Sequence, residues 1–133
     1  MTEVVAAMIQ DGNGRILVCR RPLQKTRGGL WEFVGGKLEP GETEEDALIR
    51  ECREELGVTV LPKSIFYKVT HRYPDLEILL TLYRADIVEG TPQLLEHMEL
   101  RWVDLDALSS LAFCPADEEI LRVIADYRAK GLL

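Results

Sequence analysis

Apolar residues occur in short runs separated by glycine, proline and charged residues, and their spacing changes along the chain. Short apolar or alternating runs predict β-strands at residues 2–9, 15–20, 30–34, 58–60, 65–71, 76–88 and 100–103. A 3.6-residue period predicts helices at residues 44–56 and 116–129, with a short helix or turn at 104–111. This order predicts an α+β fold, an α/β/α sandwich around a mixed β-sheet.

Turn and capping residues set the expected boundaries. Residues 11–14 (DGNG) predict a hairpin turn, residues 22–29 a loop, and Gly35 and Gly36 a break in the strand pattern. Thr43 is expected to cap the first helix, and Gly57 suits the left-handed position just past its end. An apolar row docks this helix and comprises Leu48, Cys52 and Leu56.

Another face of the same helix carries carboxylates. Glu51, Glu54 and Glu55 stand at positions i, i+3 and i+4, and this spacing places them on one side of a helix. Three carboxylates so close together repel one another in water, whereas a divalent cation would convert that repulsion into binding. The pattern therefore favours a metal-dependent enzyme that acts on a phosphorylated substrate.

Length and composition narrow the possible classes. The chain has 133 residues and a net charge of −7, which fits one domain spanning residues 1–133 and argues against binding to a nucleic-acid polymer. No apolar run is long enough to span a membrane, and the first ten residues do not resemble a signal peptide. The three cysteines lack CxxC spacing and indicate free thiols in the cytoplasm.

The charge is unevenly distributed. Residues 15–37 hold six cations against one acid, and residues 39–55 hold eight acids against two cations. A basic stretch beside an acidic one suits a polyphosphate carried with its metal. Two solvated surfaces are the alternative interpretation.

The glycine loop and the acidic helix together resemble the Nudix box, in which a glycine, a glutamate, an Arg-Glu pair, a Glu-Glu pair and a final glycine have fixed spacing. Every fixed position is filled, by Gly36, Glu42, Arg50, Glu51, Glu54, Glu55 and Gly57. Residues 30–37 (LWEFVGGK), Glu96 and residues 113–117 (FCPAD) extend the resemblance to the MutT-like subgroup over nearly the whole chain. Val34 stands where that subgroup usually has proline.

The resemblance implies the Nudix fold and a Mg²⁺-dependent enzyme, with Mn²⁺ as a possible substitute. Its substrate would be a nucleoside triphosphate, hydrolysed to a monophosphate and pyrophosphate. The implied role is removal of 8-oxo-dGTP or of a modified or cytosine nucleotide from the pool. The chain would act as a monomer or homodimer without a membrane partner.

The resemblance also implies roles for individual residues. The metal ligands would be the carbonyl of Gly35 or Gly36 together with Glu51, Glu54, Glu55 and Glu96. The catalytic set would be Arg50, Glu51, Glu54 and Glu96, with Arg50 orienting the glutamates. Glu42 and Gly57 would support the box structurally.

The remaining candidates each have a structural alternative. Arg20, Arg21 and Lys37 are expected to contact phosphate, or else to be exposed cations. By resemblance Phe33 lines the base pocket, with a role as a core aromatic as the alternative. His97 is expected at the surface, with a role in tuning the site beside Glu96 as the alternative.

Asp117 is the main indication of base specificity. An ionised Asp117 would accept a hydrogen bond from the exocyclic amine of cytosine. If burial keeps it protonated, it could serve an oxidised purine instead. Its structural alternative is the N-cap of the last helix.

Two other functions stay open. One is a Nudix hydrolase for another substrate, such as ADP-ribose or a dinucleoside polyphosphate. The other is a nucleotide sensor without catalysis, which the complete set of box carboxylates argues against.

Overall fold

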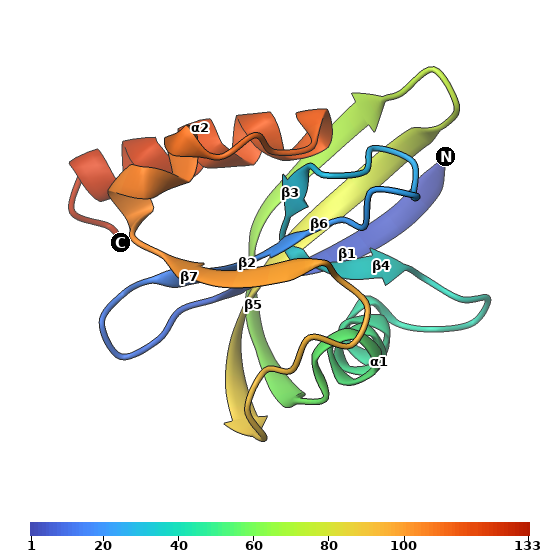
Figure 1. Cartoon of the computed structure of the whole chain (residues 1–133), viewed down its shortest axis with the longest axis horizontal. Coiled ribbons are helices and arrows are strands. Elements are labelled where there is room, and N and C mark those ends of the chain that lie inside the picture. The colour runs from blue at the N-terminus through green and yellow to red at the C-terminus, as the bar shows by residue number, and fades with distance from the viewer.

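The computed structural model describes all 133 residues and places two β-sheets between two long helices (Figure 1). The strands are β1 (Thr2–Ile9), β2 (Ile16–Arg20), β3 (Trp31–Glu32), β4 (Val34–Lys37), β5 (Thr59–Arg72), β6 (Glu77–Glu89) and β7 (Glu99–Val103). The helices are α1 (Glu44–Leu56), the short 3₁₀ helix η1 (Leu105–Ser110) and α2 (Pro115–Ala129). No helix is long and apolar enough to cross a membrane.

The larger sheet is mixed, as the element order predicts. Its strand order is β4-β1-β6-β5, and the second sheet has the order β3-β2-β7. β1 pairs in parallel with β6, whereas the other neighbours pair in antiparallel fashion. The α+β class and the mixed sheet are therefore confirmed, with the strands divided between two sheets.

Alternate side chains of β1 pack in two different apolar cores. Val5 and Ala7 pack in the cluster that contains Leu48 and Cys52 of α1, whereas Met8 belongs to the cluster under α2. Successive side chains of a strand point to opposite faces, so each face of the sheet receives one helix. Figure 1 shows α1 and α2 on opposite sides of the strands.

Three strand predictions differ from the structure. Residues 30–34 were expected as one strand, but they divide between β3 and the start of β4, which lie in different sheets. Residues 58–60 and 65–71 were expected as separate strands, but β5 runs without interruption through three register shifts. One shift lies between Pro62 and Ser64, and a bulge there accommodates a proline that lacks an amide donor. Gly35 and Gly36, expected to break the pattern, lie inside β4 and pair with Ala6 and Val5.

Both predicted boundaries of α1 are present. The Thr43 hydroxyl accepts a hydrogen bond from the Asp46 amide at 3.1 Å. Gly57 follows the helix with φ of 68°, in the left-handed region. The sequence-predicted ends of α1 are therefore confirmed.

Candidate active site

The two glycines of β4 allow α1 to approach the sheet closely. A Cβ added to Gly35 would overlap the Val5 backbone, and one added to Gly36 would overlap the Glu51 carboxylate. The Gly35 amide donates a hydrogen bond to Glu55 Oε2 at 3.1 Å. The Glu51 and Glu55 side chains of α1 are therefore seated directly on the backbone of β4.

The two inner glutamates are partly or fully withdrawn from water. Glu55 is 8% exposed, and burial, followed by the charges of Glu51, Glu32 and Glu96, raises its pKa to about 9. Burial also raises the pKa of Glu51, although the Arg50 guanidinium acts in the opposite direction. A divalent cation would reverse this effect, because it favours the ionised carboxylate.

Arg50 contacts three glutamates of the box at once. It meets Glu42 through Nε at 2.8 Å and Nη2 at 2.9 Å. Nη1 lies 2.9 Å from Glu51 Oε1 and 3.3 Å from Glu54 Oε2. The paired hydrogen bonds from Arg50 lower the pKa of Glu42 to about 2. Arg50 therefore sets the positions of carboxylates on both the loop and the helix.

The donor set fits a hard divalent cation. As the side chains stand, no three acidic, histidine or cysteine groups converge into a ready-made metal site. Glu51 and Glu54 turn toward Arg50, and Glu55 turns toward the Gly35 amide. The available donors are all oxygens, which Mg²⁺ prefers. Because Gly36 has no Cβ, the Glu51 carboxylate lies against the backbone of β4. A backbone carbonyl of β4 could therefore bind the same cation as Glu51.

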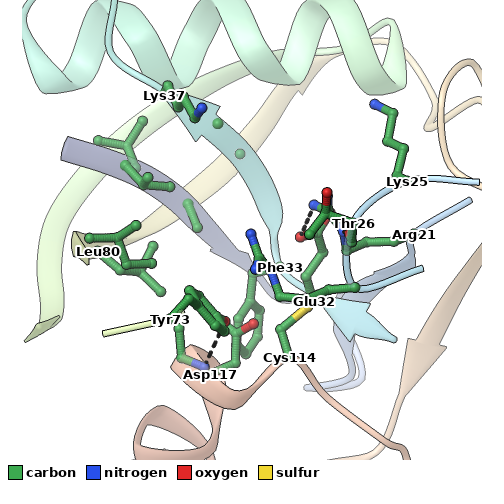
Figure 2. Close-up of a pocket in the computed structure, with 18 of the residues that line it drawn as sticks. Arg21, Lys25, Thr26, Glu32, Phe33, Lys37, Tyr73, Leu80, Cys114 and Asp117 are labelled. Carbon is green, nitrogen blue, oxygen red and sulfur yellow. Dashed lines mark hydrogen bonds and ion pairs between the residues drawn. The ribbon is translucent and has the colours of Figure 1, made fainter. Parts of the chain in front are cut away.

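A cavity of about 340 Å³ extends from this glutamate face to the start of α2. Gly35, Gly36, Lys37 and Glu55 line the end near α1, and Glu96 also lines the cavity. The opposite end is lined by Phe33, Tyr73, Cys114, Ala116 and Asp117. Figure 2 shows Lys37 beside α1 and Asp117 at the other end, near Tyr73. The cavity thus joins the predicted metal-binding and base-binding residues, and its volume suits a small organic ligand.

The second end of the cavity, called the base end here, is apolar with one carboxyl group. Phe33 is 3% exposed and packs against Phe113 with ring centroids 5.7 Å apart. Asp117 is 5% exposed, and burial, with a smaller effect from Glu32, raises its pKa well above the usual range. Phe33 therefore belongs to the core and also lines the cavity.

The N-cap interpretation of Asp117 is wrong. The capping position of α2 is Cys114, with Pro115 as the first helical residue, and no side chain caps the helix. Asp117 lies within the first turn. Because its side chain lines the cavity, it is available to a ligand.

The three predicted phosphate-contacting residues lie in different surroundings. Lys37 lines the cavity. Arg21 lines it too, but is paired with Glu32 at 3.1 Å and donates to the Thr26 carbonyl at 2.9 Å. Arg20 is not part of the lining and bonds the Gly29 carbonyl instead. The structure therefore brings Lys37 and Arg21 to the cavity and leaves Arg20 outside it.

Sequence reasoning missed several lining residues. His97, expected at the surface, is 8% exposed, and its Nε2 lies 3.0 Å from Glu32 Oε2. Lys25 and Arg27 also line the cavity, from the loop after β2. Only the basic character of residues 15–37 signalled the two cations, and no sequence pattern paired Glu32 with His97.

Comparisons with known proteins agree with this geometry. The NUDIX domain profile matches residues 5–123. A CTP pyrophosphohydrolase of Escherichia coli (strain K12) is 37% identical over 129 residues, 97% of this chain and 95% of the relative. An 8-oxo-dGTP diphosphatase of the same organism is 34% identical over 119 residues, 90% of this chain and 92% of the relative.

Solved structures show the same fold. The solution structure of the E. coli ORF135 protein has a TM-score of 0.84 and 36% identity, and the match covers 98% of this chain and 92% of that one. A MutT protein from Methanosarcina mazei Go1 has a TM-score of 0.85 over 96% of this chain and 94% of that one. At 24% identity it supports the fold alone. The domain match and the two E. coli relatives together show that this chain belongs to the Nudix hydrolase family, in its MutT-like branch.

Proposed function

We propose that this chain is a Mg²⁺-dependent nucleoside triphosphate pyrophosphohydrolase that clears oxidised or modified nucleotides from the cytosolic pool. One observation carries the proposal: a single cavity has Glu55 and Gly36 at one end and Phe33 and Asp117 at the other. A nucleotide whose phosphates carry a divalent cation needs both ends. The names of the two E. coli relatives support this reaction class, and three buried free cysteines support a reducing compartment.

Glu51, Glu54, Glu55, Glu96 and the carbonyl of Gly35 or Gly36 are the groups that would hold the metal. When bound, Mg²⁺ supplies neutralisation of phosphate charge and a lowered pKa for a bound water. Mn²⁺ accepts similar oxygen ligands and is expected to substitute. Arg50 keeps Glu51 and Glu54 in place through its contacts at 2.9 and 3.3 Å.

The chain's other residues orient the substrate. Lys37 places a positive charge beside the glutamate face, where it offsets phosphate charge. Arg21, held by Glu32 and the Thr26 carbonyl, presents a fixed guanidinium to the same cavity. Glu96, which is exposed and lines the cavity, would act as a metal ligand or would accept the proton of the attacking water.

Asp117 is the proposed reader of the base. Its raised pKa favours a neutral carboxyl group, which offers one donor and one acceptor. The O6 and N7–H groups of 8-oxoguanine present the complementary pair, so 8-oxo-dGTP is the first candidate substrate. Cytosine presents N3 and its amine in a comparable way, and similarity to a CTP pyrophosphohydrolase makes a cytosine nucleotide the second candidate.

The test is pyrophosphate release with Mg²⁺ from 8-oxo-dGTP, dGTP, dCTP, 5-methyl-dCTP, dATP, dUTP and ADP-ribose. We expect turnover of a triphosphate with equal amounts of monophosphate and pyrophosphate. Glu54→Gln should remove most of the activity and leave the fold intact. Glu89→Gln, an exposed glutamate at the end of β6, is the matched control and should retain full activity.

Other results would point to other functions. The chain would belong to another Nudix substrate class if it cleaved ADP-ribose or a dinucleoside polyphosphate and released no pyrophosphate from any triphosphate. Tight nucleotide binding without turnover at any divalent metal would indicate a sensor. Wild-type rates in Glu54→Gln would contradict the assigned role of that glutamate.

A further inference from the structure

Two loops that are far apart in the sequence meet at one arginine beside the base end of the cavity. Arg27 lies between β2 and β3, and its Nη1 is 3.1 Å from Oδ1 of Asp75, in the turn between β5 and β6. Its Cζ lies 3.9 Å from the centre of the Tyr73 ring, within the range of a cation–π contact. All three residues line the cavity. We call these two contacts the Arg27 bridge.

The backbone at Arg27 adopts an unusual conformation. Arg27 has φ of 57° and is the one non-glycine residue with positive φ in this structure. L-amino acids with side chains rarely occupy this region, and such residues persist where surrounding contacts hold them. A glycine would adopt this φ without strain. The contacts of the Arg27 side chain with Asp75 and Tyr73 therefore offset the cost of this backbone conformation.

The bridge leads directly to the proposed base reader. The Tyr73 hydroxyl, on the ring beneath Arg27, accepts a hydrogen bond from the Ala116 amide at 3.0 Å. Asp117 is the next residue, and Figure 2 shows its carboxyl beside Tyr73. Arg27, Tyr73 and the first turn of α2 thus form a continuous set of contacts along one wall of the cavity.

The charge of Arg27 is already engaged. Its guanidinium is paired with the Asp75 carboxylate, whose pKa is lowered first of all by this hydrogen bond. Lys37, at the other end of the cavity, makes no ion pair. Lys37 is therefore suited to bind phosphate, whereas Arg27 joins two loops.

We propose that Arg27 is a specificity-determining positioning residue for the nucleoside, and that it acts by holding Tyr73 and the β5–β6 turn against the base end of the cavity. The inference rests on the proposed function, because it assumes a nucleotide in this cavity. The polar contacts of Arg27 are with Asp75 and Tyr73, and none is with the glutamates of α1. The loss of Arg27 therefore weakens nucleoside binding and base discrimination, and leaves the chemical step unchanged.

The first test compares Arg27→Gln with wild type on the preferred triphosphate and its closest poor substrate. Loss of an ion pair and a cation–π contact should raise KM by roughly 5- to 10-fold at constant kcat. The ratio of kcat/KM between the two substrates should fall as well. Arg128→Gln is the matched control, because Arg128 pairs with Asp106 at 2.8 Å outside the cavity. It should leave both parameters unchanged.

A double-mutant cycle tests the bridge itself. If Arg27 and Asp75 act together, Asp75→Asn should raise KM as Arg27→Gln does, and the double variant should be no worse than either single variant. Wild-type KM in Asp75→Asn would overturn the bridge, since Arg27 would then act on the nucleotide alone. A fall in kcat with unchanged KM in Arg27→Gln would overturn the positioning role.

Product binding separates this inference from the proposed function. The Kd of the nucleoside monophosphate, measured by calorimetry without turnover, should rise in Arg27→Gln and Asp75→Asn to the same extent as KM. If the wild-type protein hydrolyses no triphosphate, the proposed function fails. The Kd values still test whether the Arg27 bridge supports nucleoside binding. If the wild-type protein is active and these variants bind the monophosphate normally, the inference about Arg27 fails alone.

Discussion

Arg50 and Glu42 form a two-point ion pair, with Nε 2.8 Å from Oε2 and Nη2 2.9 Å from Oε1. Because both nitrogens of the guanidinium edge are occupied, the side chain has one orientation. Nη1 then faces Glu51 and Glu54, while Nη2 also donates to the Lys37 carbonyl. Arg50 thus connects the segment between β4 and α1, the end of β4 and the acidic face of α1.

Arg50→Lys keeps the charge but loses this geometry, since an ammonium group cannot make the paired contact. Groups that orient metal ligands typically affect activity by about 10- to 100-fold, so we expect a fall in kcat of that order. Arg53→Lys, an exposed arginine on the same helix, should have wild-type kcat. Unchanged kcat in Arg50→Lys would show that the glutamates keep their positions without the paired contact.

Thr43→Ala should weaken α1 without touching the chemistry. The Thr43 hydroxyl accepts from the Asp46 amide at 3.1 Å, and loss of such a cap usually lowers the free energy of unfolding by about 1 kcal/mol. Urea denaturation measures this change. Thr91→Ala, at an exposed loop position, is the control and should leave the unfolding midpoint unchanged. A normal midpoint in Thr43→Ala would contradict the capping role.

Asp117 should make the stability depend on pH. Burial raises its pKa above the usual 3.8, so the folded protein retains a proton that the unfolded chain releases. The contribution of this proton to stability is complete below the unfolded pKa and is lost as pH rises toward the folded pKa. Asp117→Asn cannot ionise. The free energy of unfolding of wild type relative to Asp117→Asn should therefore decrease as the pH rises above the unfolded pKa, until the folded protein also loses the proton.

Urea denaturation of both proteins without nucleotide gives this comparison. Asp126→Asn, an exposed acid on the same helix, controls for the loss of one charge and should keep the pH dependence of the wild type. Parallel curves for wild type and Asp117→Asn would mean that Asp117 ionises normally in the folded protein. The neutral carboxyl proposed for base recognition would then be absent.

Local features were predictable because short segments encode them. Thr43 and Gly57 bound α1 through contacts with residues three or four positions away. The i, i+3, i+4 spacing of Glu51, Glu54 and Glu55 depends only on helical periodicity. The sequence could therefore indicate an acidic helix face, and the order of the predicted strands and helices indicated a mixed sheet between helices.

Features that depend on distant pairing were not predictable in this way. His97 is buried because Glu32, far earlier in the sequence, provides a partner for its ring. Arg27 reaches Asp75 across a separation of 48 residues. Gly35 and Gly36 looked like a break because isolated glycines weaken strands. In the folded structure a Cβ at Gly35 would meet the β1 backbone, and one at Gly36 would meet the Glu51 carboxylate of α1, so both glycines are required by contacts with distant segments.

The two glycines of β4 should respond differently to alanine. A Cβ at Gly36 would meet the Glu51 carboxylate, a movable side chain, whereas a Cβ at Gly35 would meet the fixed backbone of Val5. We therefore expect Gly36→Ala to lower kcat strongly with a modest loss of stability, and Gly35→Ala to destabilise the fold itself. Gly12→Ala, in open space, should change neither property. Thermal unfolding and initial rates of pyrophosphate release, measured on the same samples, separate the two effects. Full activity in Gly36→Ala would show that Glu51 acts from a position farther from β4 than the one it occupies here.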